Sequence, residues 1–169
     1  MELEAAIRSR RTHKVFGAEP VPAETVAELI ELATWAPNHH STNPWRFRVL
    51  GPASLERLKQ ATGPEGASKL DRAPTLIAVT SLRNEDPVVE EEDLLATGSA
   101  VYALLLAAHD RGLATYWRTP GVLRTTDGRA ALGIADNERF VALVHLGTLR
   151  QDALVPERAP LRDVLTTLD

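Results

Sequence analysis

A run of cationic and hydroxyl side chains near the N-terminus has the composition of an anion site. Arg10, Arg11, Thr12, His13 and Lys14 follow one another directly. Guanidinium groups bind a phosphate through paired hydrogen bonds, and a hydroxyl and backbone N–H groups add further donors. Runs of charge more often face water than a ligand, so a solvated basic turn is the alternative. The run predicts a phosphate site or a solvated turn, and its surroundings must decide between them.

Two further polar stretches lie where secondary-structure elements are expected to end. Residues 36–45 read Ala-Pro-Asn-His-His-Ser-Thr-Asn-Pro-Trp, and their amide, imidazole and hydroxyl groups could converge on a polar ligand. Tyr116, Trp117, Arg118 and Thr119 end a predicted strand, where Trp117 would offer an aromatic wall to a planar ring. In the alternative interpretations, residues 36–45 form an ordinary polar loop, Trp117 belongs to the core and Arg118 is exposed.

Most familiar catalytic signatures are absent from the chain. It contains no G-x-G-x-x-G, no G-x-x-x-x-G-K-[ST], no G-x-S-x-G and no H-E-x-x-H. The five histidines, at positions 13, 39, 40, 109 and 145, include no i, i+4 pair, so we expect no metal site. The absence of cysteine excludes disulfides, thiolate metal sites and cysteine catalysis.

Length and composition favour one globular domain over residues 1–169. Of these residues, 44% are hydrophobic and 25% are charged, which is ordinary for a folded domain. The net charge of −4 argues against a nucleic-acid binder, which normally shows a basic surface. The acidic start leads into no apolar signal core, and no apolar run reaches the roughly 18 residues of a membrane span. We therefore expect a cytoplasmic protein with no membrane or nucleic-acid partner.

Hydrophobic periodicity predicts the elements that position these stretches. Strands are predicted at residues 45–50, 75–80, 113–118 and 140–149, and shorter helices at 3–10, between Pro22 and Pro37, at 54–61, at 127–132 and in a turn or two within 161–168. Residues 63–66, Gly-Pro-Glu-Gly, predict a flexible connection. A long helix begins within the acidic segment 85–93 and ends at Gly112. Interspersed strands and helices indicate an α+β or α/β layer flanked by helices.

The long helix is unusually rich in small residues, among them Gly98 and Ser99. A glycine inside a helix costs up to about 1 kcal/mol relative to alanine. We therefore expect a close approach to this helix by a second helix, across a dimer or within the chain, or by a ligand.

Taken in order, these motifs resemble those of the nitroreductase family. Residues 10–14 are similar to its RRSxR pattern, and residues 36–49 to its AP(S/D)xxxxQPWxFxV loop and strand. Residues 107–118 resemble its small-residue helix with a GLG-like turn and strand, and residues 144–147 its strand closing on glycine. The order and spacing extend over nearly the whole chain. The histidine after Ala-Pro-Asn and the Trp-Arg-Thr run resemble the compact YdjA-like branch.

The resemblance implies an α+β nitroreductase-like fold, with a central mixed, mostly antiparallel sheet flanked by helices, in an intertwined homodimer with FMN at the interface. It implies an FMN-dependent oxidoreductase that takes electrons from NADH or NADPH. The acceptor would be a nitroaromatic, a quinone or a similar organic molecule, reduced by ping-pong hydride transfer. It implies no dedicated protein acid or base.

By position, the resemblance also implies the FMN-binding residues, with Trp35 and His39 supplied by the partner subunit: Arg10, Arg11, Thr12, Trp35, His39, Trp117, Arg118 and Thr119. Arg10 or Arg11 would hold the phosphate. The positive charge of Lys14 or Arg118 would stabilise the reduced flavin.

The chain departs from the family pattern at several positions. Thr12 replaces a serine but keeps the hydroxyl, Asn43 replaces a longer glutamine, and Trp35 stands where branch members can carry a basic residue. The short chain leaves little room for inserted helices, so we expect a shallow, permissive substrate pocket. Two alternatives are an FMN-binding carrier or sensor with little reductase turnover, and an α+β interaction module without a cofactor.

Overall fold

The fold is built on a four-stranded sheet, which a computed structural model describes together with the rest of residues 1–168. The strand order is β1–β2–β4–β3, with β1 at Trp45–Val49, β2 at Thr75–Leu82, β3 at Leu113–Arg118 and β4 at Glu138–Thr148. All three strand pairings are antiparallel. The α+β prediction is confirmed. The expectation of a mixed sheet is wrong for the named strands, because parallel pairing occurs only at an isolated bridge between Thr12 and Thr115.

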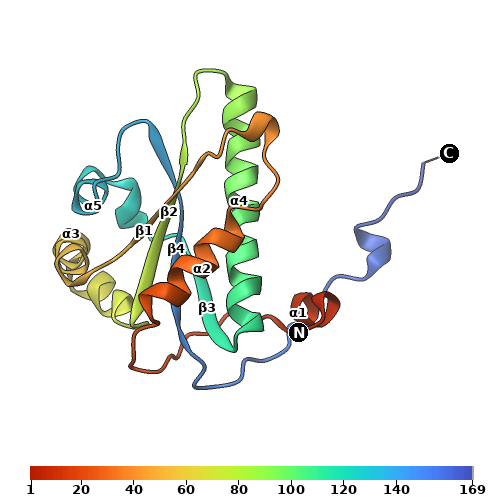
Figure 1. The fold of residues 1–169 in the computed structure, drawn as a ribbon, viewed down its shortest axis with the longest axis horizontal. Helices are drawn as coiled ribbons and strands as arrows, with labels where there is room; N and C mark the ends of the chain where they lie inside the picture. The colour runs from red at the N-terminus through yellow and green to blue at the C-terminus, as the bar shows by residue number, and fades with distance from the viewer. Residues whose placement is uncertain (169) are drawn as a thin grey trace.

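Helices cover both faces of the sheet (Figure 1). Helices α2 (Ala23–Ala33) and α4 (Pro87–Asp110) pack on one face, and α3 (Pro52–Leu70) and α5 (Thr126–Ala131) pack on the other. Helix α1 (Leu3–Ser9) lies at the C-terminal end of α4, where Ser9 contacts His109. Short 3-10 turns occur at η1 (His39–Ser41), η2 (Gly121–Arg124) and η3 (Leu161–Asp163). The C-terminal segment passes α1 and runs away from the sheet (Figure 1).

Side-chain alternation along the strands divides the core into two layers. In β2, Ile77 and Val79 pack towards α2 and α4, whereas Leu76 and Ala78 pack towards α3 and α5. Because successive strand residues point to opposite faces, a strand covered on both sides is apolar throughout. This arrangement confirms the prediction of a fully buried strand at residues 75–80 and explains why both faces need helices.

Helix α3 extends further than the predicted helix at residues 54–61. Helical turns occur on both sides of Gly63, which has φ +74° and interrupts the helix. Proline is tolerated in the first turn of a helix, so Pro64 begins the second part instead of ending the element. The Gly-Pro-Glu-Gly stretch is therefore a break within α3 and not a flexible connection.

The long helix α4 contacts both the end of α1 and the loop before β1. The Asp86 side chain accepts a hydrogen bond from the Val88 N–H at 2.9 Å and thereby caps the first turn. Gly112, at φ +71°, takes the left-handed conformation that turns the chain into β3. Both ends of α4 agree with the prediction. Within residues 1–168, no helix combines the length and apolar character needed to cross a membrane.

Candidate functional site

The basic segment after α1 is held against the edge of the sheet. The His13 N–H donates to the Thr115 carbonyl at 3.0 Å, and Thr12 forms a parallel bridge with Thr115. Helix α1 ends at Arg10, whose backbone is already extended at ψ 129°. The sequence run Arg10–Lys14 is therefore an extended strand-like segment beside β3 and not a free turn.

The two arginines of this segment carry donors without acceptors. The Arg11 Nη1 donates to the carbonyls of Arg8 at 2.6 Å and Arg10 at 2.8 Å. The Nε atoms of Arg10 and Arg11 are buried and have no hydrogen-bond partner among residues 1–168. Leaving a buried donor unsatisfied costs about 1–3 kcal/mol, and more for a charged group. A bound phosphate would supply the missing acceptors, so these residues fit the phosphate of FMN.

The strand-end run Trp117–Thr119 presents its side chains on alternate faces. Trp117 lies on the α4 face, where the nearest atom of its ring is 3.9 Å from the position that a Cβ on Gly98 would take. Arg118 lies on the other face and donates to the Lys69 carbonyl at 3.1 Å. Thr119 is exposed just beyond the strand. A ring bound against one face of this strand can therefore meet only one of the Trp117 and Arg118 side chains.

Arg118 is also paired with a buried histidine that sequence reasoning did not assign to the site. The Arg118 Nη1 lies 3.5 Å from His145 Nε2, and its guanidinium lies 5.8 Å from the centre of the Tyr116 ring. Burial, with repulsion from Arg118 and Arg72, lowers the pKa of His145 to about 3. His145 is thus neutral near pH 7, and its Nε2 can accept a hydrogen bond from Arg118.

The loop before β1 is attached to the N-terminal half of α4. His39 Nδ1 lies 2.7 Å from a Glu92 carboxylate oxygen, and the Thr42 hydroxyl donates to Asp93. His40, Ser41 and Asn43 all have positive φ, at 50°, 54° and 46°, which is uncommon for residues other than glycine. The Asn43 side chain donates to the Ser41 carbonyl within this loop. Nearby, the Trp35 side chain is 83% exposed, so the loop holds His39 while leaving a large aromatic ring uncovered.

Five of the predicted site residues fall into two groups, because α1 and the loop before β1 lie at opposite ends of α4 (Figure 1). Trp117 lies between the two groups, where its ring approaches Gly98 near the middle of α4. Ser9, next to Arg10, contacts His109 near the end of α4, whereas His39 contacts Glu92 near its start. Glu92 and His109 are almost five turns apart, which corresponds to roughly 25 Å along the helix axis. One chain therefore brings Arg10, Arg11 and Thr12 beside β3 but does not bring His39 or Trp35 to them.

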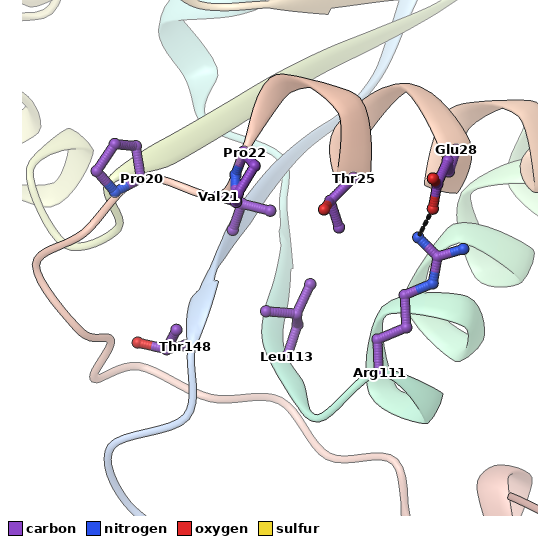
Figure 2. Close-up of a pocket in the computed structure, with 8 residues that line it drawn as sticks. All are labelled: Pro20, Val21, Pro22, Thr25, Glu28, Arg111, Leu113 and Thr148. Carbon is purple, nitrogen blue, oxygen red and sulfur yellow. Dashed lines mark ion pairs between the residues drawn. The ribbon is translucent and has the colours of Figure 1, made fainter.

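A hollow of about 540 Å³ lies between the start of α2 and the start of β3 (Figure 2). The Arg111–Glu28 ion pair, at 2.7 Å, lies on its wall, and Val21 and Leu113 supply apolar lining. None of the predicted FMN-binding residues lines it. Its position does not coincide with either group of site residues.

Besides His145, two more residues near the predicted site were not assigned to it from the sequence. His109 lies in the last turn of α4 beside the basic segment, and Glu92 holds His39. The position of His109 just before the GLG-like turn was visible, but its proximity to α1 depends on tertiary packing. Among the described residues, no group of three or more His, Cys, Asp and Glu side chains is arranged to hold a metal ion.

Comparison with known proteins identifies the family. The model of the nitroreductase family matches residues 7–148. YfhC of Bacillus subtilis (strain 168), which carries the name of an NAD(P)H nitroreductase, is 31% identical over 98% of this chain and 94% of its own. A nitroreductase-like family protein from Bacillus cereus superposes with a TM-score of 0.91 at 22% identity, over 99% of this chain and 96% of the other. A Desulfovibrio desulfuricans protein, named as a nitroreductase in complex with FMN, gives a TM-score of 0.81 at 27% identity, over 98% and 96% of the two chains.

The range matched by the family model contains the basic segment, the loop and the strand-end run. The family match covers most of the chain, and the YfhC match covers nearly all of it. This protein therefore belongs to the nitroreductase family, a family of oxidoreductases.

Proposed function

We propose that this chain forms one FMN-binding domain over residues 1–169 and works as an NAD(P)H-dependent reductase. The observation that carries the proposal is the pair of buried guanidinium Nε atoms, on Arg10 and Arg11, that have no partner among residues 1–168. The FMN complex of the Desulfovibrio desulfuricans relative supports the same cofactor here. Bound FMN would supply the redox chemistry by accepting hydride from the nicotinamide and passing it to the acceptor.

The residues of the chain then bind and orient the cofactor. Arg10 and Arg11 hold the phosphate, and the exposed Thr12 hydroxyl lies on the same segment. Because the Arg118 guanidinium is already engaged by Lys69 and His145, Lys14 is the better source of positive charge for the reduced ring. The backbone at Trp117–Thr119 lines the flavin ring. The Trp117 side chain lies on the face of β3 that α4 covers.

We propose a homodimer because one chain separates the two groups of site residues by about 25 Å. If a second copy packs its α4 antiparallel to the first, the start of one α4 lies beside the end of the other. That arrangement places His39 and Trp35 of one subunit near Arg10 and Arg11 of its partner. The uncovered Trp35 ring, at 83% exposure, is available for such a contact.

An exposed apolar stripe on α4 supports this pairing. Val88, Leu95 and Tyr102 recur every seven residues, and their exposed fractions are 62%, 65% and 40%. A seven-residue apolar repeat is typical of helices that pack along their length. The C-terminal segment likewise exposes apolar side chains that could cover a second subunit, in the manner of an intertwined dimer: Leu154, Val155, Leu161, Val164, Leu165 and Leu168.

The acceptor we propose is a nitroaromatic, a quinone or a similar organic molecule, reduced in the cytoplasm by ping-pong turnover. A hollow of about 340 Å³ between the loop and α4 is lined by apolar Leu95 and Ala96 and by polar Asn38 and Ser99. Its mixed lining suits a planar acceptor with polar substituents.

FMN titration of an Arg10→Ala, Arg11→Ala double variant tests the proposed cofactor site. Each charged hydrogen bond contributes about 1.5–3 kcal/mol, so the dissociation constant for FMN should rise more than about 100-fold. Arg124→Ala, on the exposed side of η2, is the matched control and should bind FMN like the wild type. Circular dichroism checks that all variants fold. An unchanged FMN affinity in the double variant would place the phosphate elsewhere.

A further inference from the structure

The loop at residues 38–43 contains every residue other than glycine that has a positive φ within residues 1–168. These residues are His40, Ser41 and Asn43, at 50°, 54° and 46°. A side chain disfavours this left-handed conformation, so such residues persist only where the surrounding structure holds them. The loop lies beside the first half of α4 (Figure 1), which is therefore the element able to hold it.

One buried contact fastens the loop to α4. The Thr42 hydroxyl donates to the carboxylate of Asp93, a residue that is only 4% exposed. A carboxylate is costly to bury unless hydrogen bonds satisfy it, so separating this pair would leave Asp93 with one donor fewer. The contact, named the latch here, therefore favours a single position of the loop relative to α4.

The latch lies next to a residue of the proposed FMN site. His39 precedes Thr42 by three positions, and its Nδ1 atom lies 2.7 Å from a carboxylate oxygen of Glu92, the neighbour of Asp93. The side chains of His39 and Glu92 are 57% and 40% exposed. Because a pair at such exposure contributes little, it cannot by itself keep His39 in place. The buried latch beside it is better able to do so.

Hydrogen bonds within the loop connect Thr42 to the rest of it. The Asn38 side-chain oxygen accepts from the Asn43 N–H at 2.9 Å, which joins the two ends of the loop. The Asn43 amide donates to the Ser41 carbonyl at 2.7 Å. The loop therefore moves as one unit, and the position of Thr42 also sets the position of His39.

We propose that Thr42 and Asp93 are positioning residues, which hold the loop in its left-handed conformation and fix His39 before FMN arrives. The proposal rests on the proposed function, in which His39 of one subunit contacts the FMN of its partner, and adds two residues that need not touch FMN. When the latch opens, the three left-handed residues relax and His39 leaves its position. The apparent affinity for FMN is then reduced by the fraction of chains in which the latch is closed.

Hydrogen exchange of the Asn43 N–H tests the latch in the protein without FMN. Thr42→Val removes the hydroxyl and nearly preserves the shape of the side chain. A hydrogen bond to a charged group corresponds to a factor of about ten or more, so the loop should open, and Asn43 exchange, about tenfold faster. Thr42→Ser keeps the hydroxyl and should exchange at close to the wild-type rate. An unchanged rate in Thr42→Val would overturn the proposal.

Thr34→Val is the matched control for the lost hydroxyl. Thr34 is exposed at the end of α2, and its hydroxyl donates to the Glu31 carbonyl at 2.7 Å. The control loses a hydrogen bond of the same donor outside the loop and should leave the exchange of Asn43 unaltered. An equal acceleration in Thr34→Val would assign the effect to general stability and contradict the latch.

Substitutions of Ser41 test whether the latch works against backbone strain. Glycine adopts a positive φ at no steric cost, whereas alanine keeps the Cβ atom and the strain. Both remove the hydroxyl. Added to Thr42→Val, Ser41→Gly should recover part of the lost protection of Asn43, and Ser41→Ala should recover none. Equal rates for the two double variants would contradict the role of strain.

FMN titration of the same variants connects the latch to the cofactor site. Thr42→Val should raise the dissociation constant for FMN several-fold, up to about tenfold, while Thr42→Ser and Thr34→Val should bind like the wild type. Faster exchange with unchanged FMN affinity would contradict the role in fixing His39. Failure of the wild type and all variants to bind FMN would instead contradict the proposed function, while hydrogen exchange would still test the latch.

Discussion

At the scale of single residues, His145 is a buried imidazole whose neutral form can accept a hydrogen bond from Arg118 at the end of β3. It is fully buried in β4, and its Nδ1 has no hydrogen-bond partner among residues 1–168. Its neutral form allows Arg118 to donate to it, and Arg118 in turn joins β3 to the end of α3 through Lys69. Protonation would place a second cation against Arg118 in a buried site.

His145 should therefore make the free energy of unfolding depend on pH. In the folded state its pKa is about 3, against an ordinary value of 6.5, so the unfolded chain binds more protons between those values. Stability from this residue is present above about pH 6.5 and is lost as the pH falls towards about 3. By pH 4.5 the loss should be about 2–3 kcal/mol.

Urea unfolding of the wild type and His145→Gln across this pH range measures the effect. The variant is less stable at neutral pH, but its stability should fall less steeply with acid. His40→Asn, a change of an exposed histidine, should retain the wild-type slope. Parallel pH profiles for the wild type and His145→Gln would contradict the assignment of a neutral buried imidazole.

Residue types and spacing located the basic segment, the loop and the strand-end run, but not their contacts. The side chains of Trp117 and Arg118 lie on opposite faces of β3 because side chains alternate along a strand. This arrangement could be predicted from the sequence. The contacts of His109 with Ser9 and of Arg118 with His145 join positions far apart in the sequence. No local pattern encodes such pairs, because they depend on the packing of α1 against α4 and of β3 beside β4.

At the scale of elements, the substitution Gly98→Ala tests why α4 contains so many small residues. A Cβ at this position would lie 3.9 Å from the Trp117 ring, which is an ordinary van der Waals distance. Gly98→Ala should therefore fit within the chain and raise the free energy of unfolding by up to about 1 kcal/mol, because alanine favours a helix. Thermal unfolding of the variant under matched conditions measures this change.

The exposed Ser99 provides the matched comparison on the next position of α4. Ser99→Ala should also raise helix stability slightly and leave the Trp117 contact intact. If Gly98→Ala lowers stability, or separates the proposed dimer while Ser99→Ala does not, the glycine is needed for a close approach between subunits. That result would contradict the intrachain explanation.

The boundaries of most elements could be predicted because apolar periodicity and capping residues agree with the final packing. The strand at residues 113–118 is observed at Leu113–Arg118, and the long helix has the acidic start and glycine end that were predicted. The second half of α3 was missed because Gly63 and Pro64 are local signals for an interruption. Buried Leu70, packed in the core beyond the break, favours the additional helical turns.

At the scale of the whole molecule, a substitution in the exposed apolar stripe on α4 tests the proposed homodimer. Leu95→Glu places a charge in the middle of the proposed interface and should weaken association by about 2 kcal/mol or more. Light scattering coupled to size-exclusion chromatography measures the mass, and FMN titration should show a parallel loss if the partner completes the site.

Leu32→Glu is the control for this change, because Leu32 is also exposed, at 47%, but lies on α2. It should leave both the mass and FMN binding unaltered. A Leu95→Glu protein with the wild-type mass and FMN affinity would contradict the arrangement in which α4 pairs across the dimer. The sequence could not predict which exposed apolar residues form a stripe, because that depends on which face of α4 the sheet covers.

The most direct test of the proposed function is the rate at which NADH or NADPH reduces the FMN-loaded protein. Rapid mixing without oxygen follows the loss of the oxidised flavin's visible absorbance, and a second mixing step adds a quinone or nitroaromatic. We expect rapid reduction by at least one nicotinamide, followed by rapid reoxidation by the acceptor, with both rates sufficient for steady-state turnover. FMN that binds but is reduced far more slowly than turnover requires would indicate a carrier or sensor. A protein that cannot be loaded with FMN would contradict the proposed function altogether.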